Sequence, residues 1–106
     1  MSQLRLHQEI GGYRFEGPYI NIRRIPAGPG LYAIISYDGK QYYLLDIGYA
    51  KSLNKACRSN QRKECWEKAK VGNIHFAFLQ NDELDADAYR GIVTEIRTKY
   101  KKIPCK

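Results

Sequence analysis

The sequence contains few of the residues that metal-binding and disulfide-rich domains need. It has three cysteines, Cys57, Cys65 and Cys105, and two histidines, and no two cysteines form a Cys-x-x-Cys pair. A structural zinc site takes four such ligands at short spacings, so we expect no zinc site. The odd number of widely spaced cysteines favours reduced thiols over a disulfide framework.

Long apolar runs are also missing from the chain. No stretch approaches the ~20 apolar residues of a membrane-spanning helix. Residues 1–7 contain no apolar stretch of signal-peptide length. We therefore expect a cytoplasmic protein that does not associate with a membrane.

What the chain does contain is enough for one small globular domain. It has 106 residues, of which 43% are hydrophobic, including nine tyrosines, three phenylalanines and one tryptophan. This aromatic content argues against disorder. Lysine and arginine number 18 against 11 acidic residues, a net charge of +7, which suits a polyanionic partner.

Hydrophobic periodicity predicts three strands and three helices. Alternating or continuous apolar runs indicate strands at 31–36, 41–47 and 74–79. An Asp-Gly pair at 38–39 predicts a tight hairpin turn between the first two. Helical spacing predicts helices at 52–59, 62–69 and 84–100, the last with Asp82 as its N-cap.

The order hairpin, helix pair, strand, long helix predicts an α+β fold. We expect a small sandwich with a three-stranded antiparallel sheet flanked by helices. A single domain then covers residues 1–106. Residues 1–29 are expected to form a leader with at most a short strand at 13–16, because three prolines interrupt this segment.

Several short motifs follow one another along this predicted fold. They are Tyr-Arg-Phe-Glu-Gly-Pro at 13–18, Gly-Leu-Tyr at 30–32, Asp-Ile-Gly at 46–48, Arg-Lys-Glu-Cys-Trp at 62–66, Glu-Ile-Arg at 95–97, Tyr100, and Pro-Cys at 104–105. Together they resemble the GIY-YIG nuclease superfamily, in a bacterial branch whose second motif reads D-V-G. The resemblance covers nearly the whole chain.

The resemblance implies hydrolysis of a DNA phosphodiester. In the family, a tyrosine positions or deprotonates the attacking water, and an arginine stabilises the extra charge on the phosphate. A glutamate on the long helix holds one divalent metal, and a histidine or tyrosine assists proton transfer. Cations and a metal suit this chemistry because it depends on positioning and charge stabilisation.

Carried onto this sequence, most of the family's catalytic positions are lost. Tyr32 matches the tyrosine, and Asp46 is the residue expected in this branch. The arginine, histidine and glutamate positions fall on Ala56, Asn60 and Val93. We therefore predict a vestigial site with no catalytic residue, no metal and no cofactor.

Two nearby charges do not restore the site. Arg58 and Glu95 each lie two residues from a lost position, about 200° around a helix, and so point the other way. Cys65 and Cys105 occur together in the branch, which implies that they lie close. We expect them to pack together rather than form a disulfide.

Most of the positive charge lies in one segment. Residues 49–70 carry seven lysines and arginines against two glutamates, a net +5 of the total +7. Phosphate contacts of this kind position a nucleic acid without reading its sequence. The residues predicted to bind nucleic acid are Tyr49, Lys51, Lys55, Arg58, Arg62 and Lys63.

Each of these features also has a structural interpretation. Tyr32 can fill the core, and Asp46 can cap the backbone N–H of Tyr49 or Ala50 in a turn. Tyr49 can pack instead of stacking on a base, and Trp66 is expected in the core. A basic helical face can simply be solvated.

Three functions remain open from the sequence. The first is a catalytically inactive GIY-YIG-like domain that binds DNA or RNA non-specifically through its basic helical face. The second is a protein-interaction module or homodimer built on the same inactive fold. The third is a divergent DNA endonuclease, which alone would need Mg²⁺.

Overall fold

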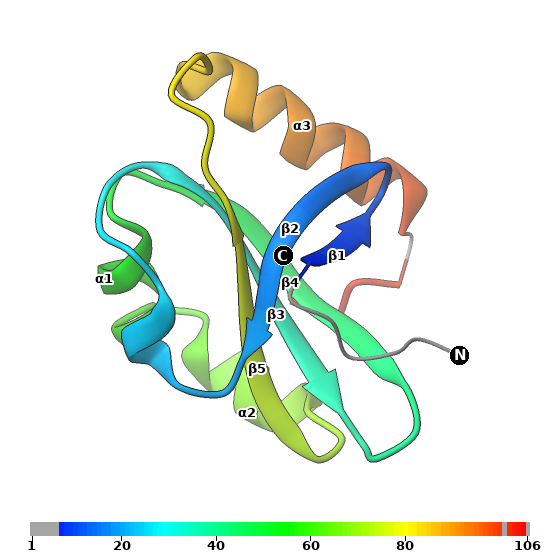
Figure 1. Ribbon diagram of the computed structural model, residues 1–106. Helices are drawn as coiled ribbons and strands as arrows, with labels where there is room; N and C mark the ends of the chain where they lie inside the picture. Colours follow the sequence, from blue (N-terminus) through cyan, green and yellow to red (C-terminus); the bar gives the residue numbers. More distant parts are fainter. Residues whose placement is uncertain (1–6, 101, 106) are drawn as a thin grey trace.

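The computed structural model describes residues 7–100 and 102–105 of the chain (Figure 1). The strands are β1 (His7–Ile10), β2 (Tyr13–Tyr19), β3 (Gly30–Tyr37), β4 (Tyr42–Ala50) and β5 (Asn73–Leu79). The helices are η1 (Ile22–Arg24), α1 (Leu53–Arg58), α2 (Lys63–Ala69) and α3 (Ala86–Lys99).

The five strands form one curled antiparallel sheet in the order β1-β2-β5-β3-β4. The prediction of a three-stranded sheet is therefore wrong, although the fold is mixed α and β. The two additional strands come from residues 7–19, which were expected to be a leader. They form a hairpin, and β2 pairs with the free side of β5.

Local sequence signals explain why this hairpin was missed. Pro18 removes one backbone donor, and on sequence alone this argues against a strand at its position. In the structure it lies where the register of β2 against β5 shifts, between Glu16 and Tyr19. A proline is tolerated at such an irregularity, and Phe15, just before it, is fully buried.

The other elements occupy the predicted places. The strands β3, β4 and β5 and the helices α1 and α2 confirm the predicted segments to within a few residues. The long helix starts later than expected, because its N-cap is Asp85 and not Asp82. The Asp85 carboxylate accepts the Ala88 N–H at 2.8 Å, which satisfies one free donor of the first turn.

Helices cover both faces of the sheet (Figure 1). Alternate residues of β3 point to opposite faces, so Ala33 joins the core cluster under α3 and Ile34 joins the cluster under α1 and α2. We call these the α3 side and the α1–α2 side of the sheet. The motif tyrosine, Tyr32, lies on the α1–α2 side.

A disulfide joins α2 to the C-terminal segment. Cys65 and Cys105 are bonded with 5.9 Å between their Cα atoms, whereas Cys57 is free and buried. The prediction that these two cysteines remain reduced thiols is wrong for the structure. The cysteine count could not reveal the pairing, because the fold brings together residues 40 positions apart.

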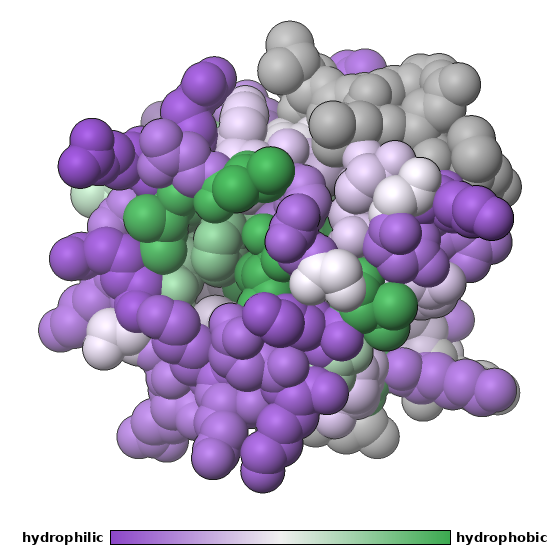
Figure 2. Space-filling view, turned by 90° about the horizontal axis from the view of Figure 1, so that it is seen from below, coloured by the Kyte–Doolittle hydropathy of each residue, from purple (hydrophilic) through white to green (hydrophobic). Residues whose placement is uncertain are grey.

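Figure 2 shows one face covered largely by hydrophilic side chains, with hydrophobic residues gathered near its middle. Across the described residues, no helix has both the length and the apolar character needed to cross a membrane. Among the described residues, the large apolar side chains that stay exposed are Ile20, Tyr43, Val71 and Tyr100.

Candidate nucleic-acid interface

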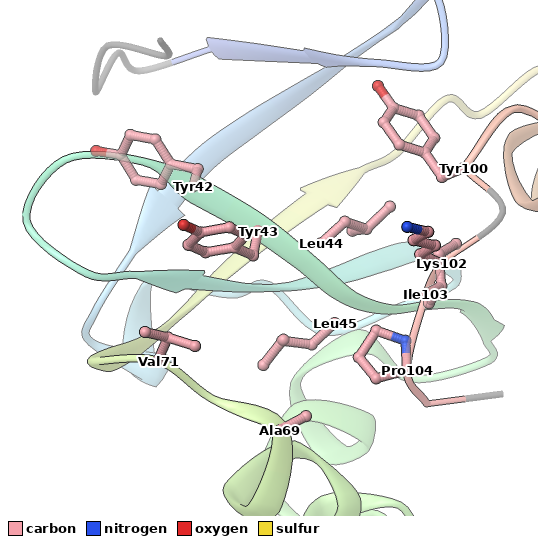
Figure 3. A pocket seen from close by; sticks show the side chains of 10 residues that line it. All are labelled: Tyr42, Tyr43, Leu44, Leu45, Ala69, Val71, Tyr100, Lys102, Ile103 and Pro104. Atoms are coloured by element: carbon pink, nitrogen blue, oxygen red, sulfur yellow. The ribbon is translucent and has the colours of Figure 1, made fainter.

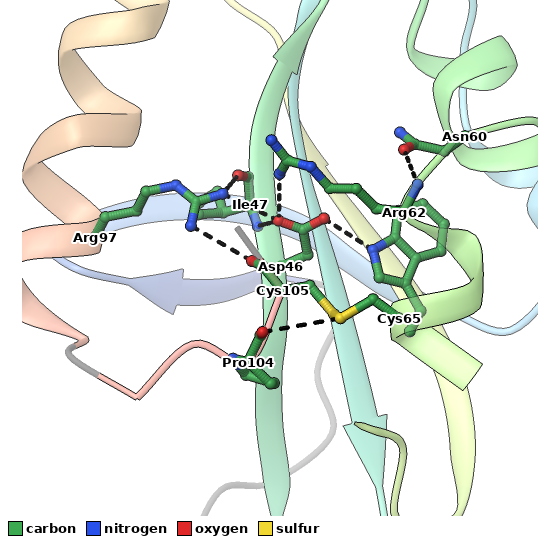
Figure 4. Close-up of a disulfide and its surroundings, with 9 residues drawn as sticks. Asp46, Ile47, Asn60, Arg62, Cys65, Arg97, Pro104 and Cys105 are labelled. Atoms are coloured by element: carbon green, nitrogen blue, oxygen red, sulfur yellow. Dashed lines mark hydrogen bonds and ion pairs between the residues drawn. A yellow bond between two sulfur atoms is a disulfide. The ribbon is translucent and has the colours of Figure 1, made fainter. Parts of the chain in front are cut away.

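The Asp46 carboxylate is the centre of a buried polar network (Figure 4). It is fully buried. One oxygen accepts the Trp66 indole N–H at 2.8 Å. The other accepts the Ile47 backbone N–H at 2.8 Å, Arg62 at 2.9 Å and Arg97 at 3.0 Å. A buried charge is tolerated when it is paired and hydrogen-bonded in this way.

Arg97 is a member of this network that the sequence analysis did not identify as a partner of Asp46. In the structure it reaches back to β4, where it also donates to the Ile47 carbonyl at 2.6 Å. The interpretation of Asp46 as a cap for Tyr49 or Ala50 is wrong, because its backbone bond goes to Ile47.

Residues of four of the sequence motifs meet at this network. Asp46 comes from the Asp-Ile-Gly motif, Arg62 and Trp66 from the next, and Arg97 from Glu-Ile-Arg. The disulfide to Cys105 ties the last motif to α2 beside them. In the sequence, the only indication that these residues meet was that their motifs occur together. These contacts hold β4, α2, α3 and the C-terminal segment together.

Tyr32 lies next to this network and is only 5% exposed. Its hydroxyl lies against the backbone of Gly48. A Cβ added to Gly48 would lie 2.6 Å from the Tyr32 hydroxyl oxygen. The glycine of the Asp-Ile-Gly motif is therefore required by the close approach of a side chain. Burial raises the pKa of Tyr32, and the negative charge of Asp46 raises it further, while Asn60 and Arg62 partly offset this. A phenol of raised pKa is a weaker base catalyst at neutral pH, because less of it ionises.

A groove with a volume of about 460 Å³ opens beside α1. We call it the α1 groove. It is lined by Ala50, Lys51, Ser52, Lys55, Ala56, Ser59, Asn60, Gln61 and Arg62. The lining therefore contains Ala56 and Asn60, which were matched to catalytic positions of the resembled family, and three of the predicted nucleic-acid ligands. No carboxylate is among these described lining residues.

Arg62 connects the groove to the buried network. Its guanidinium is paired with Asp46, yet its side chain is 39% exposed. The Asn60 side chain accepts the Arg62 backbone N–H at 2.9 Å, which fixes the turn between α1 and α2. One face of Arg62 is thus held by Asp46 while the residue still lines the groove.

The remaining predicted ligands lie outside the groove. Arg58 donates to the Asn54 side chain at 2.7 Å, and Lys63 donates to the Arg58 carbonyl at 3.3 Å. Tyr49 lies on the α3 side, where its ring stacks on Tyr89 with 5.5 Å between centroids.

The positions matched to the family's site are only partly brought together. Ala56 and Asn60 share the α1 groove, and Asn60 neighbours Tyr32. Val93 instead packs against the core cluster of the α3 side. The described residues include no cluster of three or more histidines, cysteines and carboxylates that could hold a metal ion. The α1 groove presents cationic and amide side chains that can bind an anion, and its described lining residues include no carboxylate.

Comparison with known proteins found no counterpart for the chain: no protein-family model, no curated protein and no solved structure matches it.

Proposed function

We propose that this protein binds the phosphate backbone of nucleic acid without reading its sequence, as a catalytically inactive relative of the GIY-YIG nucleases. The observation that carries the proposal is the α1 groove, where Lys51, Lys55 and Arg62 gather without a carboxylate among the described lining residues. Lysine and arginine side chains supply the salt-dependent, sequence-independent part of nucleic-acid binding.

The two lysines of the groove keep their charge available for a ligand. Both are exposed, and within residues 7–100 and 102–105 neither lies within 4.0 Å of a carboxylate oxygen, unlike Lys68, Lys70 and Lys99. A phosphate that enters the groove can therefore pair with them directly. The net charge of +7 adds long-range attraction for a polyanion.

The proposal excludes cleavage because of the residues present. Ala56 and Asn60 provide neither a guanidinium nor an imidazole at the positions where the family has them. The Asp46 carboxylate is occupied by Trp66 and two arginines. Activating water at a phosphodiester needs charge stabilisation and a base beside the reacting atoms, and this groove offers only the first.

The cytoplasm remains the proposed location, since a nucleic acid is the proposed ligand. The Cys65–Cys105 disulfide bears on this, because structural disulfides are uncommon in a reducing cytosol. Alkylating free thiols inside cells before lysis, followed by mass spectrometry, tests the location. Alkylation of both Cys65 and Cys105 would support the cytoplasm. A disulfide between these two cysteines would argue for an oxidising compartment.

Titration of a fluorescently labelled DNA duplex at low and high salt tests the binding. We expect binding at about 50 mM salt that weakens steeply as salt rises. The variant Lys51→Glu/Lys55→Glu should lower the affinity about tenfold or more and reduce the slope of log K against log salt by about two. Arg62 is left unchanged in this variant because it also holds Asp46.

A matched variant separates the groove from net charge. Lys40→Glu/Lys68→Glu makes the same change in charge at exposed positions outside the groove. We expect it to weaken binding much less. Equal losses in both variants, or no binding at about 50 mM salt, would contradict the proposal. Nicking of supercoiled plasmid with Mg²⁺ that disappears in Tyr32→Phe would instead favour the active nuclease.

A further inference from the structure

A second groove, with a volume of about 460 Å³, runs along the outer edge of β4 (Figure 3). We call it the β4-edge groove. Its lining comes from β4, from the end of α2 and the turn after it, and from the C-terminal segment: Tyr42, Tyr43, Leu44, Leu45, Ala69, Val71, Tyr100, Lys102, Ile103 and Pro104. Because four consecutive β4 residues line it, and neighbours in a strand point to opposite faces, the groove follows the strand's edge.

This edge has a closed half and an open half. In the closed half, the Leu45 carbonyl accepts the Cys105 N–H at 3.0 Å, and the Ile47 carbonyl accepts Arg97 at 2.6 Å. In the open half, from Tyr42 to Leu44, the described chain supplies strand pairing only on the side of β3. β4 is the last strand of the sheet on this side.

An open edge with apolar walls is unusual for a folded protein. Natural edge strands are commonly blunted by charges, prolines, bulges or covering segments. Here the covering segment ends at Leu45, and the open half carries two tyrosines and a leucine. Tyr43 is 39% exposed and Val71, on the opposite wall, is 50% exposed. The open half therefore presents backbone groups and apolar surface together.

We propose that the β4-edge groove binds an extended segment of another protein, which adds a strand to β4 and carries apolar side chains at alternate positions and acidic residues beside them. Strand addition supplies backbone hydrogen bonds, while pockets for alternate side chains supply specificity. A groove along four residues accommodates about 13 Å of extended chain. This ligand differs from nucleic acid and uses a different part of the surface.

The charge of the groove lining indicates which kind of segment would bind there. Lys102 is the charged residue among the described lining residues, and no carboxylate is among them. An acidic segment would complement this wall. A second copy of the chain would instead bring two such basic walls and two charges of +7 together, and like charges opposed across a strand pair are destabilising.

Selection from a library of random peptides of about ten residues, displayed on phage, tests the proposal on the full-length protein. We expect enriched peptides to alternate apolar and polar residues and to carry Asp or Glu. The best peptide, made synthetically, should bind one to one and shift the backbone amide signals of Tyr42–Leu44 in NMR spectra. Lys102→Glu should redirect the selection to basic peptides.

Two lysine substitutions at exposed apolar positions provide the matched pair. Val71→Lys places a charge on the groove wall and should weaken the synthetic peptide about tenfold or more. Ile20→Lys makes the same change at a position that is 66% exposed and does not line the groove, and it should leave the affinity unchanged. Both variants add one positive charge, so we expect Val71→Lys and Ile20→Lys to change the affinity for duplex DNA by the same small amount.

Three outcomes would overturn the proposal. One is that no peptide is enriched on the wild type relative to Val71→Lys. Another is that enriched peptides bind both lysine variants equally well. The third is that light scattering shows a dimer that Val71→Lys dissociates, because the occupant would then be a second copy.

Discussion

Asp46 and Arg97 are 51 positions apart in the chain, yet their side chains meet at 3.0 Å inside the protein. The contact joins the edge strand β4 to the last helix, and Arg62 pairs with the same carboxylate oxygen from the turn before α2. A residue that resembles part of a nuclease motif thus serves here to hold three elements together. The α1 groove lies beside this network, and Arg62 belongs to both.

Replacement of Asp46 by asparagine should be strongly destabilising. The amide keeps the shape of the carboxylate but removes the counter-charge of two arginines, which are 39% and 24% exposed and therefore partly solvated. We expect this loss of charged hydrogen bonds to cost about 2–3 kcal/mol. Urea unfolding followed by circular dichroism measures the loss. Asp87→Asn is the control, because Asp87 pairs with Arg90 at 3.4 Å on the exposed surface of α3.

The control variant should change the free energy of unfolding by at most about 1 kcal/mol. Similar small losses in both variants would show that the buried network contributes little to stability. Similar large losses would mean that the measurement reports on α3 generally and not on Asp46.

Glycine at position 48 should be required by the Tyr32 hydroxyl. An alanine Cβ would lie 2.6 Å from that oxygen and 2.8 Å from the ring carbon that bears it. Overpacking of this kind costs about 1–3 kcal/mol. We expect Gly48→Ala to lower the free energy of unfolding by this amount, and Tyr32→Phe in the same chain to recover part of it.

Gly91→Ala is the matched substitution elsewhere. It lies within α3, and nothing stands within 4 Å of its added Cβ. Alanine there should stabilise the protein by about 0.5–1 kcal/mol, because glycine is a poor helix former. If Gly48→Ala also stabilised the protein, the close approach of Tyr32 would not exist in solution.

The sequence predicted the middle of this fold better than its edge. Strands β3 and β4 carry continuous apolar runs around an Asp-Gly turn, so local patterning located them. Of β2, only a short strand at 13–16 was expected, because its pairing partner, β5, lies about sixty residues later and no local pattern records such a contact. Pro18 also argued against a continuation of this strand to Tyr19.

The candidate site was predictable in composition but not in geometry. The charge of residues 49–70 pointed to the segment that contains the α1 groove, yet only Lys51, Lys55 and Arg62 of its cations line that groove. The helical spacing could not show that the side chain of Arg58 would bind Asn54. The role of Asp46 escaped prediction because its side-chain partners come from two segments, one at 62–66 and one at Arg97, that are distant from it in the sequence.

Removal of the disulfide should destabilise the protein by about 2–4 kcal/mol, since Cys65 and Cys105 close a long loop in the unfolded chain. The variant Cys65→Ser/Cys105→Ser tests this in urea unfolding. Wild type with a reductant should unfold like the variant, and the variant itself should be insensitive to the reductant. Identical unfolding of wild type and variant without reductant would show that the bond does not form.

The free thiol of Cys57 should make stability depend on alkaline pH. Burial raises its pKa to about 12, whereas a thiol in the unfolded chain ionises with a pKa of about 8.5. The folded state therefore holds its proton more tightly. This contribution to stability is complete below pH ~8.5 and is lost as pH rises towards 12. At pH ~10 the loss amounts to about 2 kcal/mol.

Urea unfolding at pH ~8 and pH ~10 of wild type and Cys57→Ala measures this effect. The alanine variant loses some packing at both pH values but lacks the thiol, so its own decrease between them should be smaller by about 2 kcal/mol. Both proteins share every tyrosine, including Tyr32, whose pKa is also raised by burial. Tyrosine ionisation therefore cancels in the comparison, apart from the small effect of the Cys57 thiolate on the pKa of Tyr32. An equal decrease in both proteins would mean that Cys57 is not shielded from water in the folded state.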